Sequence, residues 1–187
     1  MREHLEIAHL FLQDSVDLLA RYRLTAEPFW VLKSRRVKLF VDLRMAYECI
    51  LKAHIAYSDT EIDSRELLIR KVESFNHNVG RLFEELVPHI AQDLFQRGQY
   101  LNDQLALLPV SLRYSLDVSD FFDAKEEHYF ATIGKDCWLE EFAEFVEKLI
   151  LLVDMNLQAH SKIVSGNELW ESLNEESHNK YLRPPQL

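Results

Sequence analysis

The chain has 187 residues, 48% of them hydrophobic and 28% charged, and its formal net charge is −10. A chain of this length forms about one ordinary domain, which buries about 70% of the surface that its unfolded form exposes. The net charge opposes broad, nonspecific binding to a phosphate backbone. The four isolated glycines exclude glycine-rich nucleotide loops and the nucleophile elbow of hydrolases.

Two cysteines, Cys49 and Cys137, lie far apart in the sequence. Without a C-x-x-C pair or a histidine at zinc-finger spacing, they predict neither a disulfide framework nor a structural zinc site. We expect both to be small buried side chains in a reducing cytoplasm. The longest aliphatic run, residues 149–153, is far shorter than the roughly 20 residues that a bilayer requires, so a soluble cytoplasmic protein is expected.

Helical periodicity predicts an amphipathic first helix over residues 3–26, which Pro28 should end. The next helix, from Lys33 to Ser58, carries two apolar stripes instead of one, so we expect other helices to enclose most of its circumference. The first of these stripes contains Val37, Val41, Met45, Cys49 and Ala53.

A third helix is predicted to begin at a cap on Asp59 or Thr60 and to end near Ser74. Asn76 is then the expected N-cap of a fourth helix, which Pro88 should kink or divide in two. The buried side of the third helix is predicted to contain Ile62, Leu67, Leu68 and Val72.

The pattern changes in the second half of the chain. Residues 110–118 alternate between apolar and polar side chains, which predicts an extended segment across the bundle or a short irregular helix. Another helix should follow, up to a break at Gly134-Lys135, and Asp136 should cap the last long helix. Together these elements predict an all-α, single-domain bundle of about five to seven helices over residues 3–165. Residues 166–187 should form a short C-terminal helix and a disordered tail.

Charge is unevenly distributed along the chain. Seven basic residues stand against two acids in residues 21–44, whereas ten acids stand against two lysines in residues 117–147. One explanation is that oppositely charged outer faces complement each other or a second copy of the chain. The other is a basic groove for a ligand that carries phosphate.

Glu48 lies in the middle of the predicted central helix, where a buried carboxylate is costly unless it is paired. Arg44 and Lys52 lie one turn to either side, which predicts an intrahelical ion pair at the edge of the bundle. A charged pocket is the alternative. His54, among apolar neighbours in the same helix, is predicted to be a core histidine with a hydrogen bond to a neighbour.

Arg113 and Tyr114 lie in the segment where the periodicity changes. Two roles fit Arg113: an ion pair with Glu48 or with an acid of the next helix, and the binding of a phosphate by its planar guanidinium. No metal site or cofactor is predicted. Glu85, His89 and Asp93 fall one turn apart, but Pro88 interrupts their register.

Three short segments resemble the HEPN superfamily, the small helical-bundle domains of prokaryotic toxin and defence systems and of nucleotidyltransferase partners. Residues 46–53, AYECILKA, resemble the central-helix pattern of that family, and residues 77–86, HNVGRLFEEL, are similar to the start of its next helix. Leu112-Arg113-Tyr114 resembles the Arg-Tyr that precedes its last long helix. The resemblance spans roughly residues 40–155.

Catalytic HEPN proteins are metal-independent RNases with an Arg followed by His after four to six residues. Arg113 has no histidine in that window, so the resemblance favours a noncatalytic protein. Arg70 and His77 have the required spacing at an earlier place in the chain. In an RNase of this type the arginine would stabilise phosphate and the histidine would transfer protons.

The sequence therefore predicts a noncatalytic HEPN-like module that binds a nucleotide or RNA phosphate, or a protein partner, in a stress or defence system. A homodimer that forms through an apolar helix face is expected, and the resemblance implies a nucleotidyltransferase or an antitoxin as a further partner. Two alternatives remain, a divergent RNase toxin that uses Arg70 and His77, and a purely structural dimeric scaffold. The candidate ligand-binding residues are Lys33, Arg35, Arg36, Arg44, Glu48, Arg113 and Tyr114.

Overall fold

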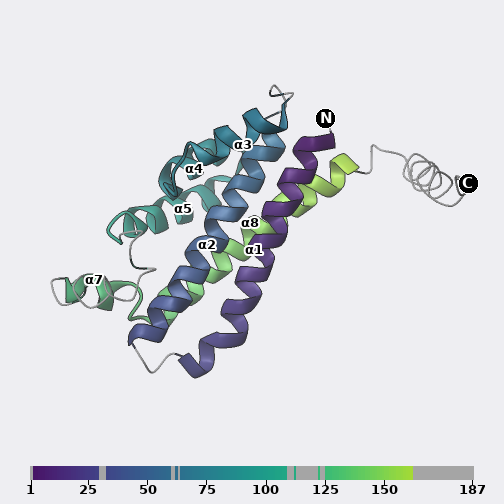
Figure 1. The fold of residues 1–187 in the computed structure, drawn as a ribbon. Coiled ribbons are helices and arrows are strands. Elements are labelled where there is room, and N and C mark those ends of the chain that lie inside the picture. The colour runs from purple at the N-terminus through teal and green to yellow at the C-terminus, as the bar shows by residue number, and fades with distance from the viewer. Residues whose placement is uncertain are drawn as a thin grey trace, which may run out of the picture.

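The structure, a computed structural model, describes residues 2–29, 33–59, 62, 64–108, 112, 122 and 125–161. Regular secondary structure in these ranges is entirely helical, which confirms the predicted all-α bundle (Figure 1). The elements are α1 (Arg2–Phe29), α2 (Lys33–Ser58), α3 (Arg65–Glu73), α4 (Val79–Leu86), the short 3-10 helix η1 (Val87–His89), α5 (Gln92–Leu105), α7 (Glu126–Ala131) and α8 (Asp136–Ser161).

Helix α2 lies at the centre of the bundle. It packs against α1, α3, α4 and α8, and Figure 1 shows α1, α2 and α8 as three long helices with α3 to α5 on one side. Fourteen of its residues are buried, including all but one of the side chains from Ile50 to Ile55. This enclosure confirms the prediction for most of the helix, but Met45 of the first apolar stripe is exposed and Val41 and Cys49 are half-buried.

The aromatic core fixes three helices against one another. The ring of Tyr47 on α2 makes edge contacts with Phe142 and Phe145 on α8, with ring centres 5.6 Å and 5.7 Å apart. Its hydroxyl accepts a hydrogen bond from Nδ2 of Asn102 on α5 at 2.9 Å. A fully buried tyrosine needs such a partner for its hydroxyl, so this contact also sets the position of α5.

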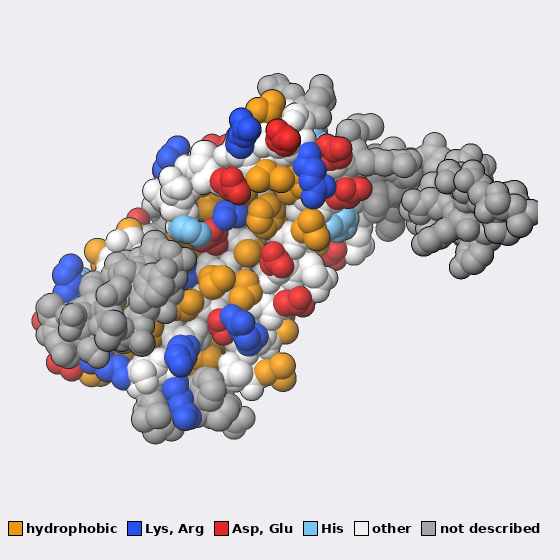
Figure 2. Space-filling view, in the orientation of Figure 1, with side chains coloured by type: hydrophobic (Ala, Val, Ile, Leu, Met, Phe, Trp, Pro, Cys, Tyr) orange, Lys and Arg blue, Asp and Glu red, His pale blue; other side chains and the backbone are white. Residues whose placement is uncertain are grey.

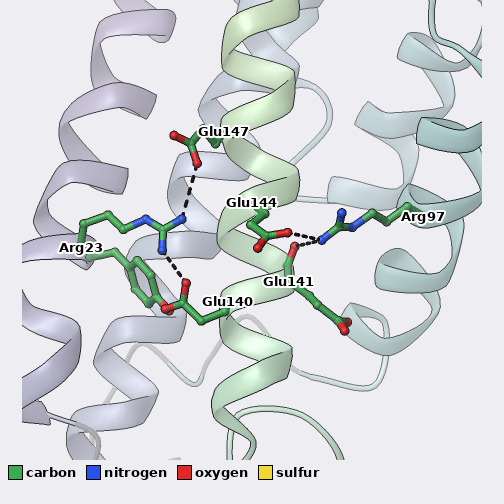
Figure 3. A network of polar contacts seen from close by, with 7 residues as sticks. Arg23, Arg97, Glu140, Glu141, Glu144 and Glu147 are labelled. Atoms are coloured by element: carbon green, nitrogen blue, oxygen red, sulfur yellow. Dashed lines mark hydrogen bonds and ion pairs between the residues drawn. The ribbon is translucent and has the colours of Figure 1, made fainter.

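Ion pairs join α1 to α8 on the outside of this core. Arg23 on α1 contacts two acids that lie two turns apart on α8, Glu140 at 2.5 Å and Glu147 at 3.5 Å (Figure 3). Tyr22 donates a hydrogen bond from its hydroxyl to Glu140 at 3.1 Å. Basic residues of the first region thus meet acids of the second, as the first explanation of the charge distribution proposed.

The other side of α8 is held by α5. Arg97 donates to the backbone carbonyl of Glu141 at 3.0 Å and to the carboxylate of Glu144 at 3.1 Å (Figure 3). The arginine side chain is 29% exposed, and partly exposed ion pairs contribute at most about 1 kcal/mol each. These contacts therefore orient α5 on α8 more than they stabilise the bundle.

Several helix boundaries differ from those that the sequence predicts. Helix α1 continues through Pro28 to Phe29, because a proline in the last turn costs the helix only one backbone hydrogen bond. Helix α3 begins at Arg65, six residues after Asp59, with Ser64 in the N-cap position. Leu67, predicted to be buried, is 54% exposed, because α3 turns the face of Leu68 and Val72, which lie one turn apart, toward the core.

The region around Pro88 agrees with the prediction that the proline divides a helix. Helix α4 stops at Leu86, η1 contains the proline, and α5 starts at Gln92. The N-cap of α4 is Asn78 instead of Asn76, and its side chain accepts from the backbone N–H of Arg81 at 3.2 Å. Helix α5 also includes residues 96–104, a polar stretch in which no helix was predicted.

Later expectations are only partly covered by the described residues. The break at Gly134-Lys135 and the start of α8 at Asp136 are as predicted. Cys137 is exposed, contrary to expectation, because it lies in the first turn of α8 outside the core. The segment 110–118, apart from Leu112, and residues 166–187 lie outside the described residues. Within the ranges that are described, no helix combines the length and the low charge needed to cross a membrane.

Candidate functional site

A cluster of three ionisable side chains forms around Glu48. The carboxylate of Glu48 accepts from Nζ of Lys52 at 2.5 Å, and Nδ1 of His77 lies 2.9 Å and 3.0 Å from its two oxygens. The Glu48 side chain is 11% exposed, whereas that of His77 is 48% exposed. A buried carboxylate is thus paired on one side within its own helix and on the other by a histidine that also reaches solvent.

The backbone before α4 brings His77 to this position. Asn76 and His77 are both in the left-handed region, with φ of 46° and 64°. Two consecutive residues other than glycine with such values are uncommon, and they are found where surrounding contacts hold a strained turn in place. The ion pair with Glu48 and the capping bond of Asn78 at the start of α4 are such contacts.

The prediction for Glu48 was correct for one partner and wrong for the other. Lys52 pairs with it as expected, but Arg44 donates to the backbone carbonyl of Leu108 at 2.7 Å instead. Sequence spacing missed His77, which is 29 residues away. Two of the three segments that resemble HEPN domains contain the two members of the pair, one Glu48 and the other His77. This was the only feature of the sequence that suggested a contact between the two residues.

The basic residues at the start of α2 are engaged with the bundle to different degrees. Arg36 is buried and donates to the carbonyl of Ile133 at 2.8 Å and to Asp136 at 2.5 Å. Nζ of Lys33 lies 5.0 Å from the ring centre of Tyr129, a cation–π contact. Arg35 is exposed. Of the predicted phosphate ligands, Arg36 and Arg44 therefore donate hydrogen bonds to groups of the bundle itself.

Arg70 and His77 do not contact each other in the described structure. Arg70 lies on α3 opposite the buried Leu68, and its guanidinium is 4.0 Å from Glu66 with both side chains largely exposed. His77 instead faces Glu48 on α2. These contacts give the Arg70–His77 RNase hypothesis no added support, and the activity stays a prediction. Arg113 and Tyr114 lie outside the described residues.

His54 is a core histidine with a hydrogen-bonded neighbour, as the sequence predicts. It is 2% exposed, and its Nε2 lies 3.2 Å from Oγ of Ser58. Its ring centre is 5.1 Å from that of His89 on η1. Burial, reinforced by the neighbouring charge of His89, lowers the pKa of His54 to about 4, so the imidazole is neutral at physiological pH.

Acidification is expected to destabilise the fold through His54. Because the folded-state pKa lies below the unfolded value, this stability is complete above about pH 6.5 and is lost as the pH falls toward 4. The linkage predicts a loss of about 2 kcal/mol between pH 7 and pH 5. Urea unfolding at both pH values should show a smaller loss for His54→Phe than for the wild type. Equal losses in the two proteins would contradict the assignment.

A strip of apolar side chains lies where α1 and α2 meet the solvent. Leu10 is 58% exposed and Met45 is 45% exposed. The strip, called the α1–α2 strip below, consists of Leu10, Phe11, Leu18, Val41, Met45 and Cys49, of which all but Leu10 and Met45 are half-buried. Figure 2 shows hydrophobic side chains along the middle of the face that α1 and α2 form.

Contacts between the two helices place these residues side by side. Ser15 donates to the carbonyl of Ala46 at 2.8 Å, and Arg21 donates to Asp42 at 2.9 Å, so α1 and α2 are antiparallel with a fixed register. The same register sets Leu18 beside Met45. Met45 belongs to the first apolar stripe of α2, which the sequence predicted to be covered.

Within the part of the chain that the structure describes, no three or more His, Cys, Asp and Glu side chains form a group that could hold a metal ion. Comparison of the chain with protein-family models, with curated proteins and with solved structures found no significant match. The features that bear on function are therefore the Glu48–His77 cluster, the α1–α2 strip and the resemblance of three short segments.

Proposed function

We propose that this chain is a noncatalytic HEPN-like module that binds protein in a stress or defence system, and that it does so through the α1–α2 strip. The observation that carries the proposal is the exposure of Met45 and Leu10 beside the half-buried remainder of the strip. Exposed apolar side chains that gather on one face, with polar residues around them, are typical of protein interaction sites.

A protein partner is favoured over a phosphate ligand because of how the basic residues are used. Arg36 and Arg44, two of the expected phosphate ligands, donate to groups inside the bundle. Arg23, which also belongs to the basic region, contacts Glu140 and Glu147. Moving any of these guanidinium groups to a phosphate would leave a buried carbonyl or an acid without its partner, which opposes the exchange.

The partner that we propose is a second copy of the chain, as the sequence analysis also expects. Exposed acids lie toward one end of the strip and exposed bases toward the other, and Figure 2 shows Lys and Arg side chains at its lower end. A two-fold axis through the middle of the strip would set the acidic end of one copy on the basic end of the other. The residues concerned are Glu3 and Glu6 at the first end and Arg35 and Lys38 at the second, and Glu6 also lies 3.5 Å from Arg65.

Substitution of Met45 by glutamate should convert the protein to a monomer. The change places a charge in the centre of the proposed interface, where its desolvation weakens association by about tenfold or more. Sedimentation equilibrium should give twice the chain mass of 22.1 kDa for the wild type and the chain mass for the variant. Thermal unfolding followed by circular dichroism checks that Met45→Glu is folded.

Met155→Glu is the matched control, because Met155 is 69% exposed on α8 and lies outside the strip. This variant should remain a dimer. A monomeric wild type, or a Met45→Glu protein that dimerises like the control, would refute the second copy as the partner.

A further inference from the structure

Two imidazole rings lie together between α2 and η1, away from the α1–α2 strip. The ring centre of His54 is 5.1 Å from that of His89, and the two ring planes make an angle of 54°. His54 is buried, whereas His89 is exposed. One ring is thus fixed inside the bundle and the other covers it at the surface, where an ion could enter from solvent.

One nitrogen of this pair has no protein partner among the described residues. Nε2 of His54 lies 3.2 Å from Oγ of Ser58, but Nδ1 of His54 is buried and makes no hydrogen bond. An unsatisfied buried polar atom costs about 1–3 kcal/mol, so such atoms are rare unless a ligand or ion completes them. The unpaired Nδ1 of His54 therefore indicates that a ligand or an ion binds at this position.

The separation of the two rings suits a metal ion. Two imidazoles that bind one tetrahedral zinc ion, each through a nitrogen about 2.0–2.1 Å from the metal, hold their ring centres about 5 Å apart.

We propose that His54 and His89 bind a divalent transition-metal ion of the zinc class. Imidazole is a preferred ligand of such ions, whereas Ca²⁺ and Mg²⁺ prefer oxygen. Because no third His, Cys, Asp or Glu of the described residues joins the two rings in a metal-binding group, water completes the coordination. The site is open and binds more weakly than a closed structural zinc site. It joins α2 to η1 and does not depend on the proposed dimer.

Calorimetric titration of the purified protein with ZnCl₂ at neutral pH tests the site. The wild type should bind one zinc ion per chain, and the bound metal should raise the thermal unfolding temperature. His89→Ala should weaken zinc binding by about tenfold or more while leaving the metal-free protein folded, because His89 is exposed on η1. Cu²⁺ bound to the wild type should show hyperfine coupling to two nitrogens in its electron paramagnetic resonance spectrum.

His9→Ala is the matched control, since His9 is an exposed histidine on α1 and should bind zinc like the wild type. His54→Gln provides a second test, with the same loss of binding as His89→Ala. A wild type that binds no zinc overturns the proposal. So does a His89→Ala variant with unchanged affinity, or an equal loss in the His9→Ala control, which would indicate adventitious binding by surface histidines.

Discussion

Gly98→Ala is expected to destabilise the bundle by about 3 kcal/mol, although alanine favours a helix more than glycine does. A Cβ atom at this position of α5 would lie 2.2 Å and 2.5 Å from ring atoms of Phe83 and 2.9 Å from a ring atom of Phe145. Both rings are buried and belong to the aromatic core. The overlap can be relieved only by displacing the two buried rings or by moving α5 away from α4 and α8.

The sign of this effect separates packing from helix propensity. In an exposed helix, replacement of glycine by alanine would stabilise by about 1 kcal/mol. Gly80 in α4 provides that comparison, since the nearest atom to its added Cβ would be Oδ1 of Asn78 at 3.4 Å. Gly80→Ala should therefore be neutral or stabilising. Urea unfolding of the two variants measures both changes, and a Gly98→Ala protein as stable as the wild type would contradict the close approach of α5.

The same packing explains why the sequence predicts only the first residues of α5. The predicted helix reaches Phe95, whereas residues 96–104 carry few apolar side chains and Gly98 lowers their helix propensity. Besides the buried Leu101 and Leu105, the helix is positioned by specific polar contacts, such as the bond from Asn102 to the hydroxyl of Tyr47. Periodicity detects a continuous apolar face and cannot detect contacts of this kind.

The sequence predicts that other helices enclose α2, but it does not predict that Met45 stays exposed. Helical spacing identifies Met45 as a member of an apolar stripe, and a single sequence does not show which stripe another helix covers. In the structure α1 covers the α2 face at Ala46 and leaves Met45 45% exposed. The candidate interaction surface therefore follows from the register of two helices, which tertiary packing sets.

The partners of Glu48 illustrate the same limit within one site. Lys52 is one turn away on the same helix, so its ion pair follows from local geometry. His77 reaches Glu48 because the turn before α4 adopts left-handed backbone angles. Asparagine and histidine are more frequent at positive φ than most residues, but without a glycine they give only a weak signal for such a turn.

Glu48→Gln is expected to destabilise the protein by about 3 kcal/mol, because it removes the charge that compensates Lys52. The Lys52 side chain is only 15% exposed and lies 2.5 Å from the carboxylate. Glu66→Gln is the matched control, since Glu66 is 84% exposed and its ion pair with Arg70 is 4.0 Å long. That change should stay within about 0.5 kcal/mol. Urea unfolding at pH 7 measures both variants.

A double-mutant cycle then decides whether His77 is a structural partner of Glu48. Asparagine tolerates the left-handed backbone that His77 adopts, so His77→Asn removes the imidazole without adding strain to the turn. If the pair ties α2 to the turn before α4, His77→Asn should cost about 1 kcal/mol alone and much less in the Glu48→Gln background. Additive losses would mean that Lys52 alone satisfies Glu48. If His77→Asn costs nothing by itself, the half-exposed imidazole is held in a strained turn with no return in stability, as expected for a residue that contacts a ligand.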